Sequence, residues 1–392
     1  MTHPLPVNII IDFEDAFNSY SGVPISIVSD TRCLILAGFN VVLWYSNKSK
    51  TREINLWIER TFSFEQRLRI KLNSTRPSNP KMWVHQVLPW LSRSKIDCDI
   101  SISHLFPRLP LKGYHQRILR IYDPFGSHRN TLITFFTALY NGARLKHALA
   151  WAIRTYSYSS LNKEQSVKVY ISKTTKQLCK DIYRDKQSLD FVIYPTVQFA
   201  FEDSPYDFQQ NKTSIPNRPY FIFIGGQRQR KRPLPIVKLW AEALNQYDFD
   251  LVIVGRIEEQ LFSDGMKVAR NLSRLRLLAG LSVYELRKNI ELSSGVVFNS
   301  FGEGFGYPIA EAMFLKKPVI CNDLPVFREI GEGYPLFYDL GDYKAALEIL
   351  AGIISRRIDL PKQAPTWLGL EESVKLWQIA ITSSVDINKR FR

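Results

Sequence analysis

The stretch that decides the fold runs from Ser300 to Met313 and reads SFGEGFGYPIAEAM. The apolar run GVVF precedes it, and KKPVIC follows it. Pro308 suits the first turn of a helix, because it has no N–H group to leave unpaired and its φ is already helical. The stretch therefore predicts a strand, a glycine loop and a helix, with Glu303 in the loop and Glu311 in the first helical turn.

This predicted loop has the chemistry of a ligand site. Gly302, Gly304 and Gly306 let the backbone approach a ligand closely, and a helix N-terminus attracts anions. The carboxylates of Glu303 and Glu311 accept hydrogen bonds from hydroxyl groups. A ligand with both phosphate and sugar hydroxyls would satisfy the two features together. A surface turn with acidic residues beside a helix start explains the stretch about equally well when it is taken alone.

A second motif, FIFIGGQRQRKRPLPIVKLW, covers Phe221–Trp240. It predicts a strand, a Gly-Gly turn, a basic loop and a helix. The basic side chains follow the carboxyl end of a strand, where α/β proteins bind phosphates. We expect Arg230 and Lys231 to face an open cleft and to neutralise a diphosphate. A solvated loop and a nuclear-localisation or nucleic-acid patch are the alternatives for the same basic run.

The rest of the chain predicts two α/β domains. Short apolar runs alternate with helical patterns in both halves, which is typical of parallel sheets. The polar, proline-punctuated segment 206–219 is the predicted linker between an N-terminal domain, 1–205, and a C-terminal domain, 220–368. Residues 369–392 are predicted to hold a helix that packs back toward the N-terminal domain.

Two N-terminal segments carry more specific expectations. A small-residue loop is predicted over Asn18–Ser26, and the stretch ISIVSDTRCLILAGF predicts a helix with apolar residues at Ile27, Cys33, Leu34 and Ala37 and a stop at Gly38. The stretch Leu56–Leu72 predicts one amphipathic helix, which either packs on the N-terminal core or contacts an anionic membrane. Its predicted apolar stripe and the basic side chains beside it are Trp57, Thr61, Phe64, Leu68 and Leu72, with Arg60, Arg67 and Lys71.

The charge of the chain is concentrated in one region. The formal net charge is +15, and residues 51–180 hold 22 basic and 7 acidic side chains, so this region accounts for the whole excess. Such a field favours an anionic partner, for which nucleic acid, a membrane face and a phosphorylated acceptor are the candidates. Solvated surface charge without a partner is the alternative.

Composition and motifs also predict the cellular location and whether a metal or cofactor is needed. No apolar run approaches the length of a membrane span, and the N-terminal MTHPLPVNIII lacks a basic n-region, so we expect a cytoplasmic protein with at most peripheral contact at the inner membrane face. The four cysteines have neither pairs nor metal-ligand spacing, which suits a reducing compartment. The triplet Asp97-Cys98-Asp99 spells D-x-D, a metal-binding signature, but it precedes a strand without nucleotide context. We therefore expect no metal and no cofactor.

The segment Gly280–Asp339 resembles the C-terminal domain of the retaining glycosyltransferases of family 4, also called group 1. The family signature E-x7-E is met by Glu303 and Glu311. A Gly-Phe-Gly follows the first glutamate, and a proline-x-x-x-Glu follows later, from Pro325 to Glu329. The basic loop is similar to the family's G-x-x-x-x-R-K turn, with Gly225, Arg230 and Lys231 in register.

The resemblance implies a GT-B fold, in which two doubly wound Rossmann-like domains face a cleft. It implies a hexosyltransferase that uses a nucleotide sugar as donor and a saccharide or lipid-linked saccharide as acceptor, in surface polysaccharide or glycoconjugate synthesis. Glu311 would bind the donor ribose, Glu303 the sugar, and Arg230 and Lys231 the departing diphosphate. The other donor-binding positions would be Gly22, Gly225, Gly304, Phe305 and Gly306.

One position departs from the family pattern. The family often has a His-Asp pair after an N-domain strand, and this chain has Tyr122 and Asp123 there. Tyrosine, with an ordinary pKa of about 10, is a poor general base at neutral pH, and His128 lies five residues further on. A non-catalytic nucleotide-sugar-binding protein is therefore the alternative function. A nucleic-acid-binding protein and a phosphorylase or epimerase of the same fold remain open as well.

Overall fold

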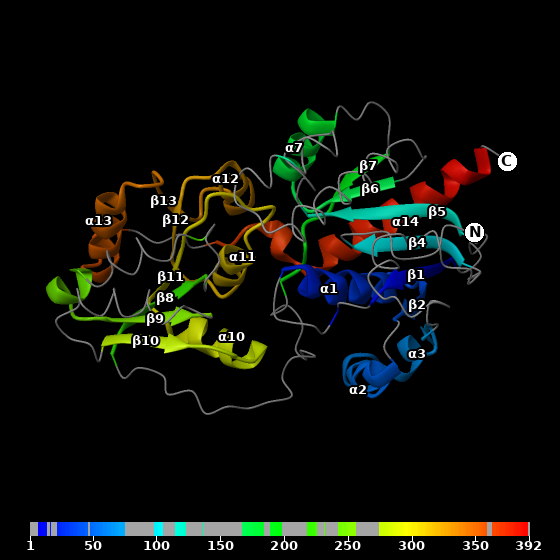
Figure 1. The fold of residues 1–392 in the computed structure, drawn as a ribbon, viewed down its shortest axis with the longest axis horizontal. Helices are drawn as coiled ribbons and strands as arrows, with labels where there is room; N and C mark the ends of the chain where they lie inside the picture. Colours follow the sequence, from blue (N-terminus) through cyan, green and yellow to red (C-terminus); the bar gives the residue numbers. More distant parts are fainter. Residues whose placement is uncertain are drawn as a thin grey trace. The chain divides into compact units, whose positions relative to one another are not determined.

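The structure is a computed structural model that divides into two compact units. The residues that it describes are 7–13, 16, 22–45, 48–74, 98–104, 114–122, 136, 167–183, 189–197, 218–225, 231, 242–255, 274–358 and 363–390. The first unit comprises Met1–Thr196 and Gly369–Arg392, and the second comprises Val197–Leu368. Figure 1 shows a sheet with flanking helices in each. Of the predicted linker, only 218–219 fall within the described residues.

The first unit is built on a parallel sheet in the order β3-β2-β1-β4-β5-β6-β7. Its strands are β1 Asn8–Asp12, β2 Asn40–Trp44, β3 Ile70–Asn73, β4 Cys98–His104, β5 Tyr114–Ile121, β6 Val167–Tyr170 and β7 Asp190–Val192. Its helices are α1 Gly22–Leu36, α2 Thr51–Thr61, α3 Phe64–Arg67, α7 Lys173–Tyr183 and α14 Leu370–Arg390. The strand order changes direction at β1 and β4, which makes the carboxyl ends of these strands the place for a ligand.

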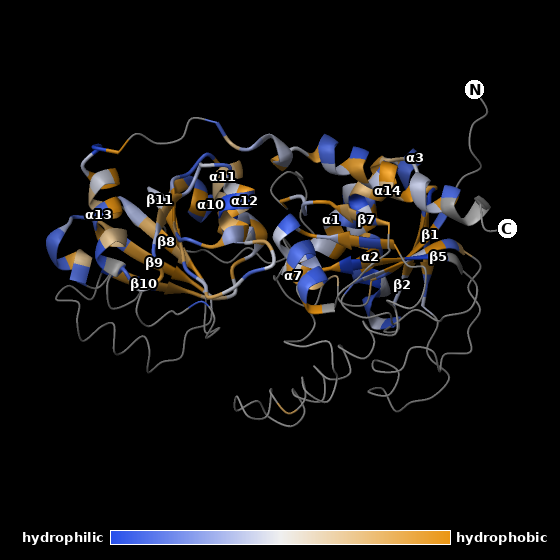
Figure 2. Cartoon of the chain, turned by 90° about the horizontal axis from the view of Figure 1, so that it is seen from above, coloured by the Kyte–Doolittle hydropathy of each residue, from blue (hydrophilic) through white to orange (hydrophobic). Residues whose placement is uncertain are grey.

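Apolar side chains on both faces of this sheet form the core of the first unit. Ile9 and Ile11 of β1 pack with residues of α1 and α2, and Trp377 of α14 belongs to the same cluster at 0% exposure. Strands covered on both faces need apolar residues at nearly every position, which is why NIIID and NVVLW read as continuous runs. Figure 2 shows α14 alternating between hydrophobic and hydrophilic residues, as expected for a helix with one buried face.

The second unit has a parallel sheet in the order β10-β9-β8-β11-β12-β13. Its strands are β8 Tyr220–Ile224, β9 Asp250–Val254, β10 Leu275–Leu278, β11 Gly295–Phe298, β12 Val319–Asn322 and β13 Leu336–Tyr338. Its helices are α10 Val283–Leu292, α11 Tyr307–Phe314, α12 Pro325–Gly331 and α13 Tyr343–Ile354. Phe221, Leu251, Val297 and Ile320 bring four of these strands into one core. Here the order changes direction between β8 and β11.

The expected class, two doubly wound Rossmann-like sheets, is confirmed, but several local predictions are wrong. Helix α1 begins at Gly22, inside the predicted loop Asn18–Ser26, because Pro24 is accommodated in a first helical turn. The stretch Leu56–Leu72 is not one helix: α2 ends at Thr61, α3 follows after a turn, and β3 begins at Ile70. Glu311 lies in the second turn of α11 rather than the first.

Strands β3, β10 and β13 were not predicted from the sequence. All three are short and lie at a sheet edge, where partial exposure hides the apolar pattern. Among the described helices, none combines the length and the apolar character needed to cross a bilayer.

Candidate active site

Two loops meet at the switch point of the second sheet. Gly225 and Lys231 follow β8, and residues 299–306 follow the neighbouring strand β11. Because both loops leave the carboxyl ends of adjacent parallel strands, they lie where α/β proteins bind ligands. The second loop ends at Gly306, whose φ of 105° is in the left-handed region and which precedes the first residue of α11. A Cβ atom there would meet the Phe327 ring at 3.0 Å, so this position favours glycine in both backbone shape and space.

Lys231 and Glu303 form the central contact of these loops. The Lys231 Nζ lies 2.5 Å from Glu303 Oε1, and the two side chains are 9% and 7% exposed. The ammonium also lies 3.8 Å from the centroid of the Phe298 ring, a cation–π contact. The Lys231 charge is therefore held against a carboxylate and an aromatic face. Arg230 lies outside the described residues.

Ser300 and Asn322 fix the backbone that carries Glu303. The Asn322 side chain accepts a hydrogen bond from Ser300 N and donates one to Ser300 O, both at 2.9 Å. The Ser300 hydroxyl lies 2.9 Å from Glu303 Oε1, to which it donates. Asn322, at the end of β12, thus clamps the start of the loop and, through Ser300, orients the glutamate.

Asn299 makes the corresponding connection to Lys231. Its amide donates to the Lys231 carbonyl at 3.4 Å, and its Oδ1 accepts from the Tyr338 hydroxyl at 3.1 Å. Asn299, Ser300 and Asn322 are all 0% exposed. The Lys231–Glu303 pair is therefore supported by two buried amides and a buried hydroxyl at the ends of β11 and β12, none of which was singled out from the sequence. Their signal, a polar residue directly after an apolar strand, was present in VVFNS and VICN.

The other predicted donor-binding residues of this unit lie in the same loop and helix. Phe305 is 2% exposed and makes edge contacts with the rings of Tyr307 and Trp367, at 5.3 and 5.5 Å between centroids. Trp367 is fixed in turn by a hydrogen bond from its indole to the Ile330 carbonyl. Gly304 continues the loop, and Glu311 is 1% exposed in α11.

Gly225 has a structural reason to be glycine. A Cβ atom on it would lie 2.7 Å from the Phe223 ring and 3.4 Å from the Lys231 Cβ. A larger residue would push against the lysine that pairs with Glu303. The structure therefore brings together Lys231, Glu303 and Gly225 with the 304–306 loop.

Gly22 and Tyr122 belong to the first unit. Gly22 begins α1 after β1, and Tyr122 follows β5, so both lie at the carboxyl edge of the first sheet. Tyr122 is 6% exposed, and its carbonyl accepts a hydrogen bond from Thr175. Its ring lies 6.2 Å from the ring of His104, at the end of β4. Asp123 and His128 lie outside the described residues.

His104 belongs to a buried polar network that the sequence did not reveal. Asp30 of α1 lies 3.0 Å from Arg120 Nε and 3.3 Å from His104 Nε2, and it accepts a hydrogen bond from the Trp377 indole at 3.1 Å. Burial alone would raise the pKa of Asp30, but Arg120, His104 and Trp377 outweigh it, and the pKa is lowered. Asp30 is therefore a buried anion that joins α1, β4, β5 and α14.

The described residues contain no group of three His, Cys, Asp or Glu side chains able to hold an ion. Asp99 of the D-x-D triplet accepts a hydrogen bond from Asn8 N at 2.8 Å, so it caps the start of β1. Asp97 lies outside the described residues. The four cysteines are free and buried.

Residues 206–357 match the family model described as glycosyl transferases group 1. Among curated relatives, the Escherichia coli serotype-specific mannosyltransferase WbdA is 29% identical over 182 residues, which cover 44% of this chain and 22% of WbdA. The O-antigen chain mannosyltransferase RfbU of Salmonella typhimurium is 27% identical over 179 residues, which cover 45% of this chain and 47% of RfbU. The chain thus spans less than half the length of these relatives.

Solved structures extend the likeness to the whole fold. WaaG, a glycosyltransferase involved in lipopolysaccharide biosynthesis, matches with a TM-score of 0.55 at 11% identity, covering 97% of this chain and 99% of WaaG. Sucrose-phosphate synthase from Thermosynechococcus elongatus matches with a TM-score of 0.62 at 14% identity, covering 98% and 97%. The chain has the GT-B fold of these proteins. Its second unit carries the sequence pattern of group 1 glycosyltransferases.

Proposed function

We propose that this chain is a retaining glycosyltransferase of family 4 that transfers a hexose from a nucleoside diphosphate sugar to a saccharide or lipid-linked saccharide. The observation that carries the proposal is the Lys231–Glu303 pair at the switch point of the second sheet, inside the segment that matches group 1 glycosyl transferases. Mannose is the first sugar to test, because both curated relatives are named mannosyltransferases. RfbU, an O-antigen chain enzyme by name, supports a role in polysaccharide synthesis.

When the proposed donor binds, its diphosphate replaces Glu303 as the ionic partner of the Lys231 ammonium. The Glu303 carboxylate can then accept hydrogen bonds from sugar hydroxyls. As the bond between the sugar carbon and the diphosphate oxygen breaks, negative charge grows beside Lys231, Arg230 and the N-terminus of α11. The acceptor hydroxyl attacks from the face that the diphosphate leaves, and a diphosphate oxygen takes its proton. We assign Glu311 to the donor ribose.

The free, buried cysteines agree with a cytoplasmic location, which we also propose. No metal or other cofactor is part of the proposal. Tyr122 and Asp123 stand at the position of the family's His-Asp pair, and we assign them to the reacting end of the donor.

Two glutamine variants test the assignment. Glu311→Gln should raise the KM for the donor with little change in kcat, because a ribose contact is made equally in the ground state and the transition state. Glu303→Gln should lower kcat by about 10²-fold while nucleoside diphosphates still raise the melting temperature. If Glu311→Gln instead lowers kcat and Glu303→Gln instead raises the donor KM, the two roles are reversed.

The alternative functions have their own outcomes. A nucleotide sugar that raises the melting temperature without any turnover, including slow hydrolysis, would indicate a non-catalytic binding protein. If no nucleoside diphosphate binds but random-sequence DNA binds in a salt-dependent way, the basic region would be a nucleic-acid interface.

A further inference from the structure

The turn between α2 and β3 presents two large apolar side chains to solvent. Phe64 is 69% exposed and Leu68 is 70% exposed. The Leu68 N–H donates to the Phe64 carbonyl at 3.3 Å, so the two residues are one helical turn apart and share a face. Two adjacent side chains of this size form an apolar point on the first unit.

Packing and capping contacts support this point on both sides. On one side, α2 is anchored in the core through Ile54, Trp57 and Ile58, and the Trp57 ring stacks on Phe13 at 5.2 Å between centroids. On the other side, Ser63 and Gln66 form a reciprocal capping box at the start of α3. The exposure of Phe64 and Leu68 is therefore built into local structure that is itself well supported.

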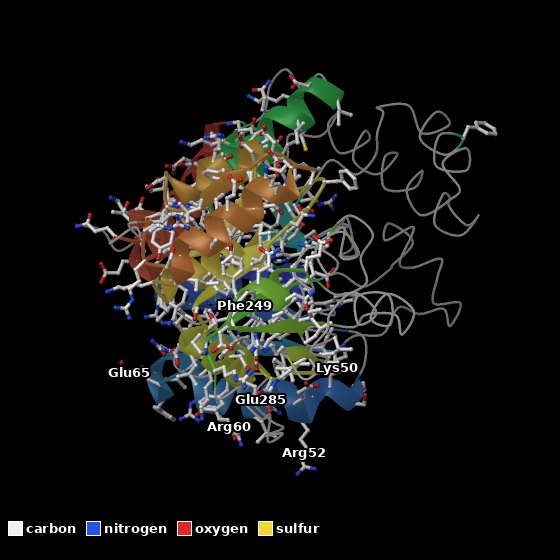
Figure 3. The ribbon with its side chains drawn as sticks, turned by 90° about the vertical axis from the view of Figure 1, so that its left-hand side faces the viewer. Lys50, Arg52, Arg60, Glu65, Phe249 and Glu285 are labelled. Carbon is white, nitrogen blue, oxygen red and sulfur yellow. The ribbon has the colours of Figure 1, made fainter. Side chains whose placement is uncertain are left out.

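Basic side chains lie on the elements that flank the apolar point, and Glu65 is the exposed acid next to Phe64. Residues 48–74 contain seven Lys or Arg and three Glu, an excess of four positive charges. Arg60 and Lys71 are exposed on either side of α3, and Figure 3 shows Arg52 and Arg60 reaching outward from α2. A hollow of about 490 Å³ on the same segment is lined by Lys48 and Arg52, with Glu59 as the acid in its lining.

We propose that this surface, which we call the α2–α3 surface, docks the first unit on an anionic membrane leaflet. Apolar side chains that enter the acyl boundary, together with cations that meet lipid phosphates, are the combination that binds a protein to an interface without a spanning helix. Two side chains bury too little area to hold a second protein copy, whereas a bilayer needs no matching surface. The inference goes beyond the proposed function, because docking requires neither donor nor acceptor.

Flotation of the full chain with liposomes tests the proposal. Vesicles of phosphatidylcholine mixed with phosphatidylglycerol should carry the protein upward, and rising salt should release it. The double variant Phe64→Ser, Leu68→Ser should bind about tenfold more weakly, since it loses two apolar insertions. Reversing Arg60, Arg67 and Lys71 to Glu should weaken binding about a hundredfold or more.

Matched variants in the second unit control for the loss of exposed apolar area and of charge. Tyr284 and Leu292 are each 53% exposed, and Tyr284→Ser, Leu292→Ser should float like the unchanged protein. Lys288, Lys344 and Arg356 are exposed basic residues of the second unit for the matching reversal. Apart from Arg67, which is half-buried, these positions are exposed, so the melting temperature should change little.

Three results would overturn the proposal. Equal recovery with neutral and anionic vesicles at low salt would show that attraction to anionic lipid does not contribute to binding. Normal flotation of Phe64→Ser, Leu68→Ser would show that Phe64 and Leu68 do not enter the lipid. Conversion of a dimer to a monomer by the same variant, without loss of flotation, would assign the surface to a second copy. Nucleotide-induced stabilisation is measured separately, so these failures are distinguishable from failure of the proposed function.

Discussion

Lys231 and Glu303 neutralise each other at 2.5 Å in surroundings that leave less than a tenth of either side chain exposed. A buried ion pair of this kind contributes little when both partners are present, but removing one partner leaves an uncompensated charge. The pair therefore makes the proposed donor site sensitive in stability as well as in activity.

The first prediction concerns this pair. Lys231→Met should lower kcat/KM by about 10²-fold and lower the melting temperature, because Glu303 loses its partner. The double variant Lys231→Met, Glu303→Gln should recover part of the lost stability, with a coupling of about 1–3 kcal/mol between the two positions. Scanning calorimetry of the single and double variants gives the comparison.

A suitable control is Lys317→Met. The Lys317 ammonium donates to the Ser293 carbonyl at 3.1 Å, and its pKa is lowered chiefly by burial. Glu291, the carboxylate that acts on Lys317, keeps its ion pair with Arg287, so the effect of Lys317→Met should be smaller and activity should remain. Strictly additive effects of the substitutions at Lys231 and Glu303 would contradict the coupling.

The second prediction concerns the clamp on Ser300. Asn322→Ala removes both hydrogen bonds to the Ser300 backbone, which leaves buried groups unpaired and should cost about 1–3 kcal/mol. Since Ser300 orients Glu303, kcat should also fall by about tenfold, with a smaller change in the donor KM. Steady-state kinetics with varied donor separates the two constants.

Asn289→Ala distinguishes positioning from general destabilisation. Asn289 is also buried, and its amide donates to the Glu285 carbonyl within α10 at 2.7 Å. Its loss should lower stability without changing kcat. If both asparagine variants lower kcat to the same extent, Asn322 acts only on stability.

The third prediction is that activity survives excess EDTA. Positive charge beside the proposed diphosphate position comes from Lys231 and the start of α11, and Asp99 is engaged by the backbone of Asn8. Initial rates before and after chelation provide the measurement. Abolished activity that Mg²⁺ or Mn²⁺ restores would mean that Asp97 and Asp99 serve a metal after all.

The fourth prediction is a rise of stability with pH caused by Lys168. Burial lowers the pKa of Lys168 to about 8, although the carboxylate of Asp190 raises it in part. Between about pH 8 and the ordinary lysine pKa of about 10.4, the unfolded chain holds a proton that the folded chain has released, so stability rises with pH in this window. Below about pH 8, the lowered pKa of Lys168 reduces the free energy of unfolding by its full amount.

Lys168→Met should therefore be more stable than the unchanged chain at pH 7, by about 1–3 kcal/mol, and the difference should shrink as pH rises through the window. Chemical denaturation of both proteins at several pH values gives the difference directly. A constant difference across the window would show that Lys168 keeps its ordinary pKa in the fold.

The sequence predicted the parts of the fold that depend on local pattern. Buried strands such as NIIID and YFIFI, and the helix start at Pro308, follow from rules that act within a few residues. Edge strand β3 was missed because its partly exposed IKLN resembles a helix face when read together with the preceding residues. Secondary structure at such an edge is decided by pairing with β2, which no local window contains.

The candidate site was predictable in its charged residues and not in its supports. Glu303 and Lys231 stand out because the loops around them have a recognisable spacing. Asn322 and Asn299 do not, since their importance lies in contacts with Ser300 and Lys231 that only the assembled sheet creates. The mutual pairing of Lys231 and Glu303 was missed for the same reason.

The position of Trp377 in the chain has a consequence for the order in which the two units can fold during synthesis. Its side chain completes the core of the first unit and binds Asp30, yet the whole second unit is translated between those two residues. During synthesis the second unit can close as soon as its own strands emerge, whereas the earlier-made first unit waits with Asp30 and Arg120 unshielded until α14 leaves the ribosome. Of the two units, the one that begins earlier in the sequence is therefore the one that completes its core later.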